Sequence, residues 1–209
     1  MKISPEQLLL NDKLNITQNI FLISGNEETL IFKVKQKLVN FFKKNGFLDI
    51  VGSENLLIDK GFQQEDPTSL FFDKKISVYR NPKIKNIEVF EGVNILKNVV
   101  ILECYNMKSG DKVKRFFEQS KNLISIACYK LSRSSKKIII DNFMKTNLIY
   151  LSKEAYSFLL ENTDSNYQIL ENELEKLLQY KNRKVSLKEL VPMLSTNIDQ
   201  ELDALFFLV

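Results

Sequence analysis

The segment Asn19–Gly25 (NIFLISG) and the segment Asn26–Gly46 after it decide the fold. The first is a short apolar run that ends in glycine, a pattern typical of a buried strand entering a turn. In the second, apolar residues recur at helical spacing between Leu30 and Phe42, and the Asn-Gly pair at its end predicts the helix stop. Strand, glycine and helix in this order are the layout of a phosphate-binding loop.

The chemistry of such a loop is missing. Counting from Gly25, the positions that a Walker A loop fills with Gly, Lys and Ser/Thr hold Leu30, Ile31 and Phe32. Glu27 adds negative charge where a phosphate group would lie. We therefore expect a degenerate, non-binding loop and no cofactor; a purely structural strand–turn–helix fits these residues equally.

Strand-like and helix-like segments alternate over the first two thirds of the chain. The expected strands cover residues 55–59, 75–79, 98–103 and 123–129, and the expected helices cover 84–96 and 109–120. This alternation predicts an α/β domain with a parallel sheet and helices on both faces. We place this domain at residues 1–142.

The rest of the chain shows a different pattern. Three helices are expected over residues 152–162, 167–180 and 186–194, with no strand, so that 143–200 forms a small helical domain. Residues 201–209 are an apolar helical start at the end of the sequence, where an exposed apolar helix gains nothing from water. We expect them to be the start of a further, truncated domain.

Composition excludes several classes of site. The 209 residues contain no His and no Trp, which removes the usual neutral-pH proton shuttle and every nucleophile or zinc site that needs imidazole. We expect the two cysteines, Cys104 and Cys128, to be buried thiols in a reducing cytoplasm, and no metal site. The apolar runs are too short to span a membrane. A net charge of +4 permits contact with a polyanion without requiring it.

The segment Thr68–Lys75 (TSLFFDKK) carries three large apolar residues in a row, Leu70, Phe71 and Phe72. Successive residues of a helical turn point about 100° apart, so three neighbours cannot all be buried on one face. An exposed Leu-Phe pair is typical of an anchor for a hydrophobic pocket on a partner. The alternative is that all three residues belong to the core.

A basic, serine-rich segment, Lys130–Lys137, follows the last expected strand and is interpreted as a loop. Its charged residues Arg133, Lys136 and Lys137 are suited to contact a phosphate backbone. A solvated loop without a partner is the alternative.

In order and spacing, four segments resemble the delta subunit of the bacterial DNA polymerase III clamp loader. They are IFLISGNEETLIFKVKQKL, DPTSLFFDKKISVY, VVILECYNMKSGDKVKRFFE and NELEKLLQY. The resemblance covers essentially the whole chain. It implies a P-loop ATPase-like (AAA+-type) parallel-sheet domain, then a small helical lid domain, then a helical collar domain that begins at 201–209 and joins other loader subunits.

The resemblance implies a non-catalytic role in DNA replication. Members of this family bind no nucleotide; they bind the sliding clamp (the beta subunit) and open it for loading on primed DNA, within a polymerase holoenzyme that is a nucleotidyltransferase. The clamp contact corresponds here to Leu70 and Phe71 within Ser69–Phe72. Two alternatives remain: a degenerate or atypical nucleotide-binding ATPase relative from another clamp-loader-like complex, and a DNA-binding regulator built on the helical region.

Overall fold

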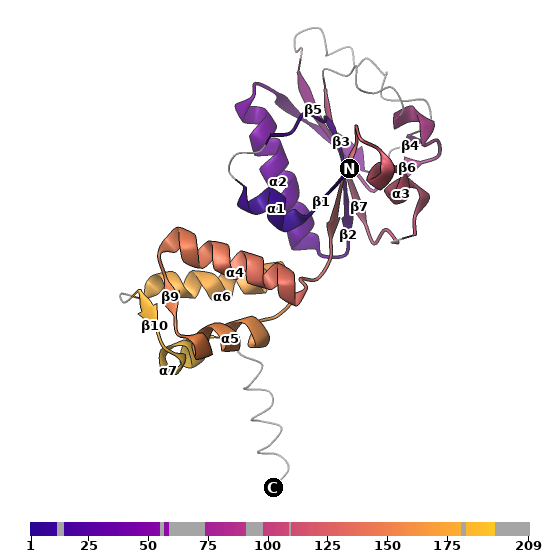
Figure 1. The fold of residues 1–209 in the computed structure, drawn as a ribbon. Coiled ribbons are helices and arrows are strands. Elements are labelled where there is room, and N and C mark those ends of the chain that lie inside the picture. The colour runs from indigo at the N-terminus through magenta and orange to yellow at the C-terminus, as the bar shows by residue number, and fades with distance from the viewer. Residues whose placement is uncertain are drawn as a thin grey trace. The chain divides into compact units, whose positions relative to one another are not determined.

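The fold is taken from a computed structural model, which describes residues 1–11, 15–54, 57–58, 74–90, 98–108, 110–180 and 183–194. The chain forms two compact units, Met1–Tyr129 and Lys130–Val209 (Figure 1). Among the described helices, none combines the length and apolar character that crossing a bilayer requires.

The first unit is built on a six-stranded sheet with the strand order β1-β8-β2-β7-β5-β3, in which all neighbours are parallel. The strands are β1 (Lys2–Ile3), β2 (Ile20–Gly25), β3 (Leu48–Glu54), β5 (Lys75–Arg80), β7 (Val99–Tyr105) and β8 (Ile124–Cys128). A separate two-stranded parallel sheet pairs β4 (Leu57–Ile58) with β6 (Lys83–Ile84). The predicted α/β fold with a parallel sheet is confirmed.

Helices cover both faces of the sheet. Helices α1 (Pro5–Leu10) and α2 (Glu28–Lys44) lie on one face, and α3 (Lys112–Gln119) lies on the other (Figure 1). The ring of Phe21 in β2 lies 5.6 Å from that of Phe42 in α2, whereas Leu22, the next residue of the strand, belongs to the cluster around Phe117 of α3. Successive side chains of a strand point to opposite faces, so a strand covered on both sides is apolar throughout.

Two strands of the main sheet escaped the sequence analysis. β1 is only two residues long, and β3 is interrupted by Gly52, where a Cβ would lie 1.8 Å from the carbonyl oxygen of Val78 in β5. The register of β3 on β5 shifts between Val51 and Glu54. The glycine that lets the two backbones approach also removes the apolar run that identifies a strand.

The helix expected over residues 84–96 is not found where the structure describes that segment. Residues 83–84 form β6, and Glu88–Phe90 forms one short 3-10 turn, η2; residues 91–97 lie outside the described residues. The strand expected over 55–59 corresponds to β4 at Leu57–Ile58, with its other positions also outside the description.

The second unit is mainly helical. Its elements are α4 (Arg133–Asn147), α5 (Lys153–Asn162), α6 (Tyr167–Lys176) with η4 (Leu177–Gln179), and α7 (Leu187–Leu190) with η5 (Val191–Met193). The three expected helices are confirmed. The expectation of no strand is wrong, because β9 (Tyr150–Leu151) and β10 (Lys184–Val185) pair in parallel.

The boundary expected between residues 142 and 143 falls inside α4, whereas the two units meet between Tyr129 and Lys130. The segment interpreted as a basic loop is the start of this helix, capped by the Ser132 side chain, which accepts a hydrogen bond from the Ser135 amide at 3.1 Å. The first turn of α4 is polar and lacks the apolar periodicity that predicts a helix, so the sequence analysis missed it.

Candidate functional site

The candidate site lies at the carboxyl ends of β2, β5, β7 and β8, the edge where α/β proteins hold their ligands. Gly25, the glycine of the degenerate loop, ends β2 with φ +151°, and a Cβ there would lie 1.8 Å from the carbonyl oxygen of Cys128. The glycine is therefore required by the close approach of β8. It needs no bound phosphate to explain it.

The amides that follow this glycine are already used. Asn26 and Glu27 both donate their backbone N–H to the carbonyl oxygen of Cys128, at 3.1 and 3.2 Å. In a phosphate-binding loop, such amides point at the anion. Here they join the loop to the end of β8, so the loop is closed by bonds within the protein.

The side chains of the loop agree with this closure. Leu30 and Ile31 are buried in the core, and Phe32 is 48% exposed, so the three positions hold apolar groups where phosphate contacts would be needed. The Glu27 carboxylate is buried beside the loop. Burial raises the pKa of the Cys128 thiol, and the charges of Glu6 and Glu27 raise it further.

The acidic residue of β7 has a partner within the protein. Glu103 has a side chain only 3% exposed, and its Oε1 lies 2.8 Å from Nζ of Lys35 in α2. The same ammonium lies 5.2 Å from the centre of the Phe32 ring. In an ATPase, an acid at the end of this strand binds a metal ion or orients water, whereas here its charge is balanced by a lysine of the facing helix.

Two asparagines link the remaining strand ends. After β5, Asn81 adopts φ 46°, donates its N–H to the Glu103 carbonyl at 2.7 Å, and accepts the Tyr105 N–H on Oδ1 at 2.9 Å. After β7, Asn106 adopts φ 57° and donates its N–H to the Gly25 carbonyl at 2.7 Å. Together with the two amides on Cys128, these bonds connect β5, β7, β2 and β8 in series.

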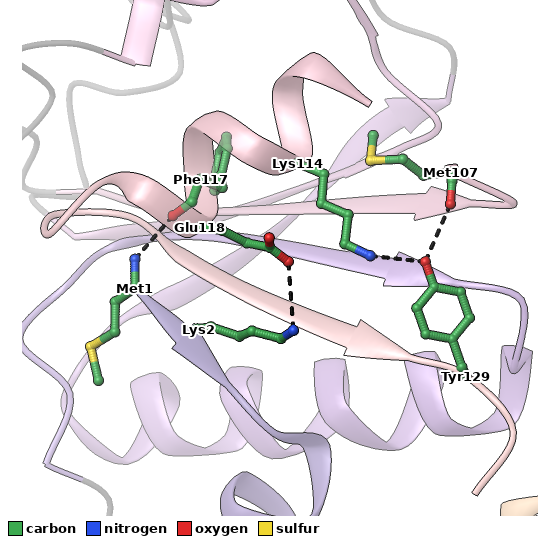
Figure 2. A network of polar contacts seen from close by, with 7 residues as sticks. All are labelled: Met1, Lys2, Met107, Lys114, Phe117, Glu118 and Tyr129. Carbon is green, nitrogen blue, oxygen red and sulfur yellow. Dashed lines mark hydrogen bonds and ion pairs between the residues drawn. The ribbon is translucent and has the colours of Figure 1, made fainter. Parts of the chain in front are cut away.

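The face of the sheet that carries α3 has its own polar network (Figure 2). Nζ of the buried Lys114 donates to the Tyr129 hydroxyl at 2.9 Å, and that hydroxyl donates to the Met107 carbonyl at 3.4 Å. Lys114 lies in α3, Tyr129 directly after β8, and Met107 two residues after β7. The network therefore fastens the helix to the same carboxyl edge.

At the far end of α3, the α-amino group of Met1 donates to the carbonyl oxygen of Phe117 at 3.0 Å (Figure 2). It also donates to the carbonyl oxygens of Leu123, at 2.7 Å, and of Ser120. A cation suits the carbonyl end of a helix. Nζ of Lys2 lies 3.9 Å from the Glu118 carboxylate beside it. These contacts hold β1 against α3.

The residues predicted to bind the clamp, Ser69, Leu70, Phe71 and Phe72, lie outside the described residues. Their role stays a prediction.

The residues predicted to approach DNA lie in the first turns of α4. Lys136 is buried; its Nζ donates to the Thr163 carbonyl at 2.8 Å, and burial lowers its pKa. Arg133 pairs with Glu161 at 3.1 Å, and Lys137 is exposed. The Lys136 amine thus ties α4 to the end of α5, while Arg133 and Lys137 remain at the surface.

Sequence reasoning missed Lys35, Asn81 and Asn106, although the two asparagines had a signal. Asn81 and Asn106 lie two and three residues after the predicted strands 75–79 and 98–103, and asparagine is the residue besides glycine that adopts positive φ most readily. In the parts of the chain that the structure describes, no cluster of His, Cys, Asp and Glu could hold a metal ion.

Comparison with known proteins finds similar proteins by sequence and by fold, while no protein-family profile matches the chain. The chain is 28% identical over 96 residues to the probable DNA polymerase III subunit delta of Rickettsia prowazekii (strain Madrid E), an alignment of 44% of this chain and 30% of that protein. Its fold is similar to the Bacillus subtilis DNA clamp loader delta protein, with a TM-score of 0.55 and 16% identity over 86% of this chain and 58% of that one. The chain spans less than two thirds of either relative. Both relatives, one found by sequence and one by fold, are delta proteins.

Proposed function

We propose that this chain, a delta-like clamp-loader subunit in sequence and fold, binds a ring-shaped sliding clamp and favours its open form. The clamp is then loaded on primed DNA during replication. The observation that carries the proposal is the closed carboxyl edge: the Asn26 and Glu27 amides donate to Cys128, and Lys35 balances Glu103. In an ATPase-type sheet, this edge holds the ligand. Here its groups bond to one another, and this fits a protein that acts as a rigid scaffold.

Clamp opening follows from differential binding. A partner opens a ring only by binding the open form better than the closed form. Leu70 and Phe71 supply affinity, since burying one such side chain contributes about 2 kcal/mol. The differential contact comes from the rest of the α/β unit, whose strand ends are joined in series through Asn81 and Asn106.

No covalent step is assigned to this chain. It acts as a non-catalytic subunit within the polymerase complex, in the reducing cytoplasm, where its two free cysteines stay thiols. Contact with other loader subunits is part of the same proposal. Arg133 and Lys137 at the start of α4 are the candidates for contact with primed DNA, because the Lys136 amine is bonded within the unit.

A test that separates this proposal from a nucleotide-binding ATPase uses gel filtration with the cognate clamp, with and without ATP and magnesium. We expect co-elution that is independent of nucleotide, and no binding of a fluorescent ATP analogue. Magnesium-dependent binding of the analogue, with clamp binding that requires it, would favour the ATPase. Failure to co-elute at micromolar concentrations would remove the clamp-binding role.

A further inference from the structure

The two-stranded sheet of the helical unit presents a surface outside the segment proposed to bind the clamp. Helix α4 is followed by Leu148 and then by β9, which pairs with β10: the Tyr150 amide donates to the Arg183 carbonyl at 2.6 Å and the Ser152 amide to the Val185 carbonyl at 3.0 Å. The pairing places Tyr150 and Leu151 of β9 beside Lys184 and Val185 of β10.

The register gives this small sheet two different faces. Tyr150 is opposite Lys184, and Leu151 is opposite Val185. Val185 is buried in the unit, whereas Tyr150 is 61% exposed and Lys184 is exposed as well. Directly opposite residues of paired strands point the same way, so an aromatic ring and an ammonium group stand together on the outer face.

Leu148 adds a second exposed apolar group beside this ring. It is 60% exposed and adopts the left-handed conformation, with φ 54° and ψ 41°. Glycine or asparagine would fit this helix end with less strain, and an exposed leucine gains nothing from water. The conformation itself closes the helix end, since the Ile149 amide donates to the Met144 carbonyl at 3.0 Å, but the exposed side chain adds an apolar group to the surface.

The charges next to β9 and β10 in the chain have one sign. The described residues 142–153, 177–180 and 183–188 contain no Asp and no Glu, and they contain five cations: Lys145, Lys153, Arg183, Lys184 and Lys188. Three of the acids that flank them accept hydrogen bonds within the unit. Asp141 accepts from the Tyr156 hydroxyl at 2.6 Å, Glu189 accepts from the Ser186 amide at 2.8 Å, and Glu154 is hydrogen-bonded to Ser152.

We propose that this β9–β10 face, centred on Tyr150 and Lys184, binds single-stranded nucleic acid. An exposed ring stacks on an unpaired base, and the surrounding lysines and arginine neutralise the phosphates. In a duplex the base faces are stacked on one another, so the Tyr150 ring would have no base to contact. An acidic protein would be bound by the cations and would likewise make no use of the ring. The surface lies in the helical unit and does not depend on the clamp.

The test measures the anisotropy of a labelled oligothymidylate of about 16 nucleotides with the full chain, at several salt concentrations. We expect Tyr150→Ala to weaken binding about 5- to 100-fold and Tyr150→Phe, which keeps the ring, to bind nearly as wild type. Lys184→Ala should weaken binding and reduce the slope of log K against log salt by about 0.7.

Phe32→Ala is the matched control, because Phe32 is another exposed ring beside a lysine, in the other unit. It should leave oligonucleotide binding unchanged, and all variants should unfold at the temperature of the wild type. A duplex that binds as tightly as the single strand, or a polyglutamate that does, would overturn the proposal. So would equal affinity of the wild type and folded Tyr150→Ala. None of these three results would bear on the clamp-binding proposal.

Discussion

Gly25 and Cys128 meet at the carboxyl edge of the sheet so closely that a Cβ on the glycine would lie 1.8 Å from the Cys128 carbonyl oxygen. The same oxygen accepts the amides of Asn26 and Glu27. One carbonyl of β8 therefore occupies the first two backbone donors after the glycine. The strand–glycine–helix layout is thus kept, and the two amides after the glycine are bonded within the protein.

Gly25→Ala should destabilise the protein by more than about 4 kcal/mol, because its Cβ must displace main chain. Gly46, at the end of α2, is the matched control: its φ is +83°, but a Cβ added there would meet nothing within 4 Å. Gly46→Ala should therefore cost about 1 kcal/mol, the strain of the left-handed conformation alone. Urea denaturation measures both, and equal losses would refute the close contact.

Asn81→Ala tests the links between strand ends. It removes the acceptor of the Tyr105 amide and places alanine at φ 46°, for a combined loss of about 2 kcal/mol in the free energy of unfolding. Asn106→Gly retains the backbone bond to Gly25 and should change stability by less than about 0.5 kcal/mol. If the two variants are equally stable in thermal denaturation, the Asn81 side chain does not join β5 to β7.

The Lys35–Glu103 ion pair makes a third prediction. Lys35→Met leaves the Glu103 carboxylate buried without its partner and should cost about 3 kcal/mol. The double variant Lys35→Met/Glu103→Leu removes both charges and should recover to within about 1 kcal/mol of the wild type. Chemical denaturation of the single and double variants decides it, and a double variant as unstable as the single one would show that the pair is not coupled.

The two thiols should be inert in the folded protein. Burial raises the pKa of Cys104 to about 12, with the charges of Asp111 and Glu103 adding to the shift, and burial also raises the pKa of Cys128. Because the thiolate is the reactive form, a disulfide reagent at a pH of about 8 should titrate neither thiol in buffer and both in denaturant. Rapid reaction of the native protein would contradict their burial.

Hydrophobic periodicity was enough to predict those helices and strands whose own residues carry an apolar pattern. β2, α2, β5, β7 and β8 each carry an apolar pattern that matches its own burial, so the parallel sheet and its helical cover follow. α4 was missed because its first turn, Arg133–Lys136, is polar in type, although Lys136 is buried there through its bond to Thr163.

The candidate site was only half predictable. The loss of Walker residues at Leu30–Phe32 can be counted in the sequence, whereas the bonds that close the loop depend on which strand lies beside β2. β8 is far from β2 in sequence yet is its neighbour in the sheet, so the role of the Cys128 carbonyl is visible only in the fold. The same holds for Lys35 of α2, whose partner Glu103 lies in β7, far away in sequence.

The most direct measurement of the central claim is calorimetric titration of the cognate clamp with the chain and with a Leu70→Ala/Phe71→Ala variant. Circular dichroism first establishes that both are folded, and Tyr150→Ala, which removes an exposed ring of the helical unit, serves as the control. We predict that the double variant loses about 3 kcal/mol or more of binding free energy and that the control loses none. Equal binding by the double variant, or no binding by a folded wild-type chain, would contradict the account.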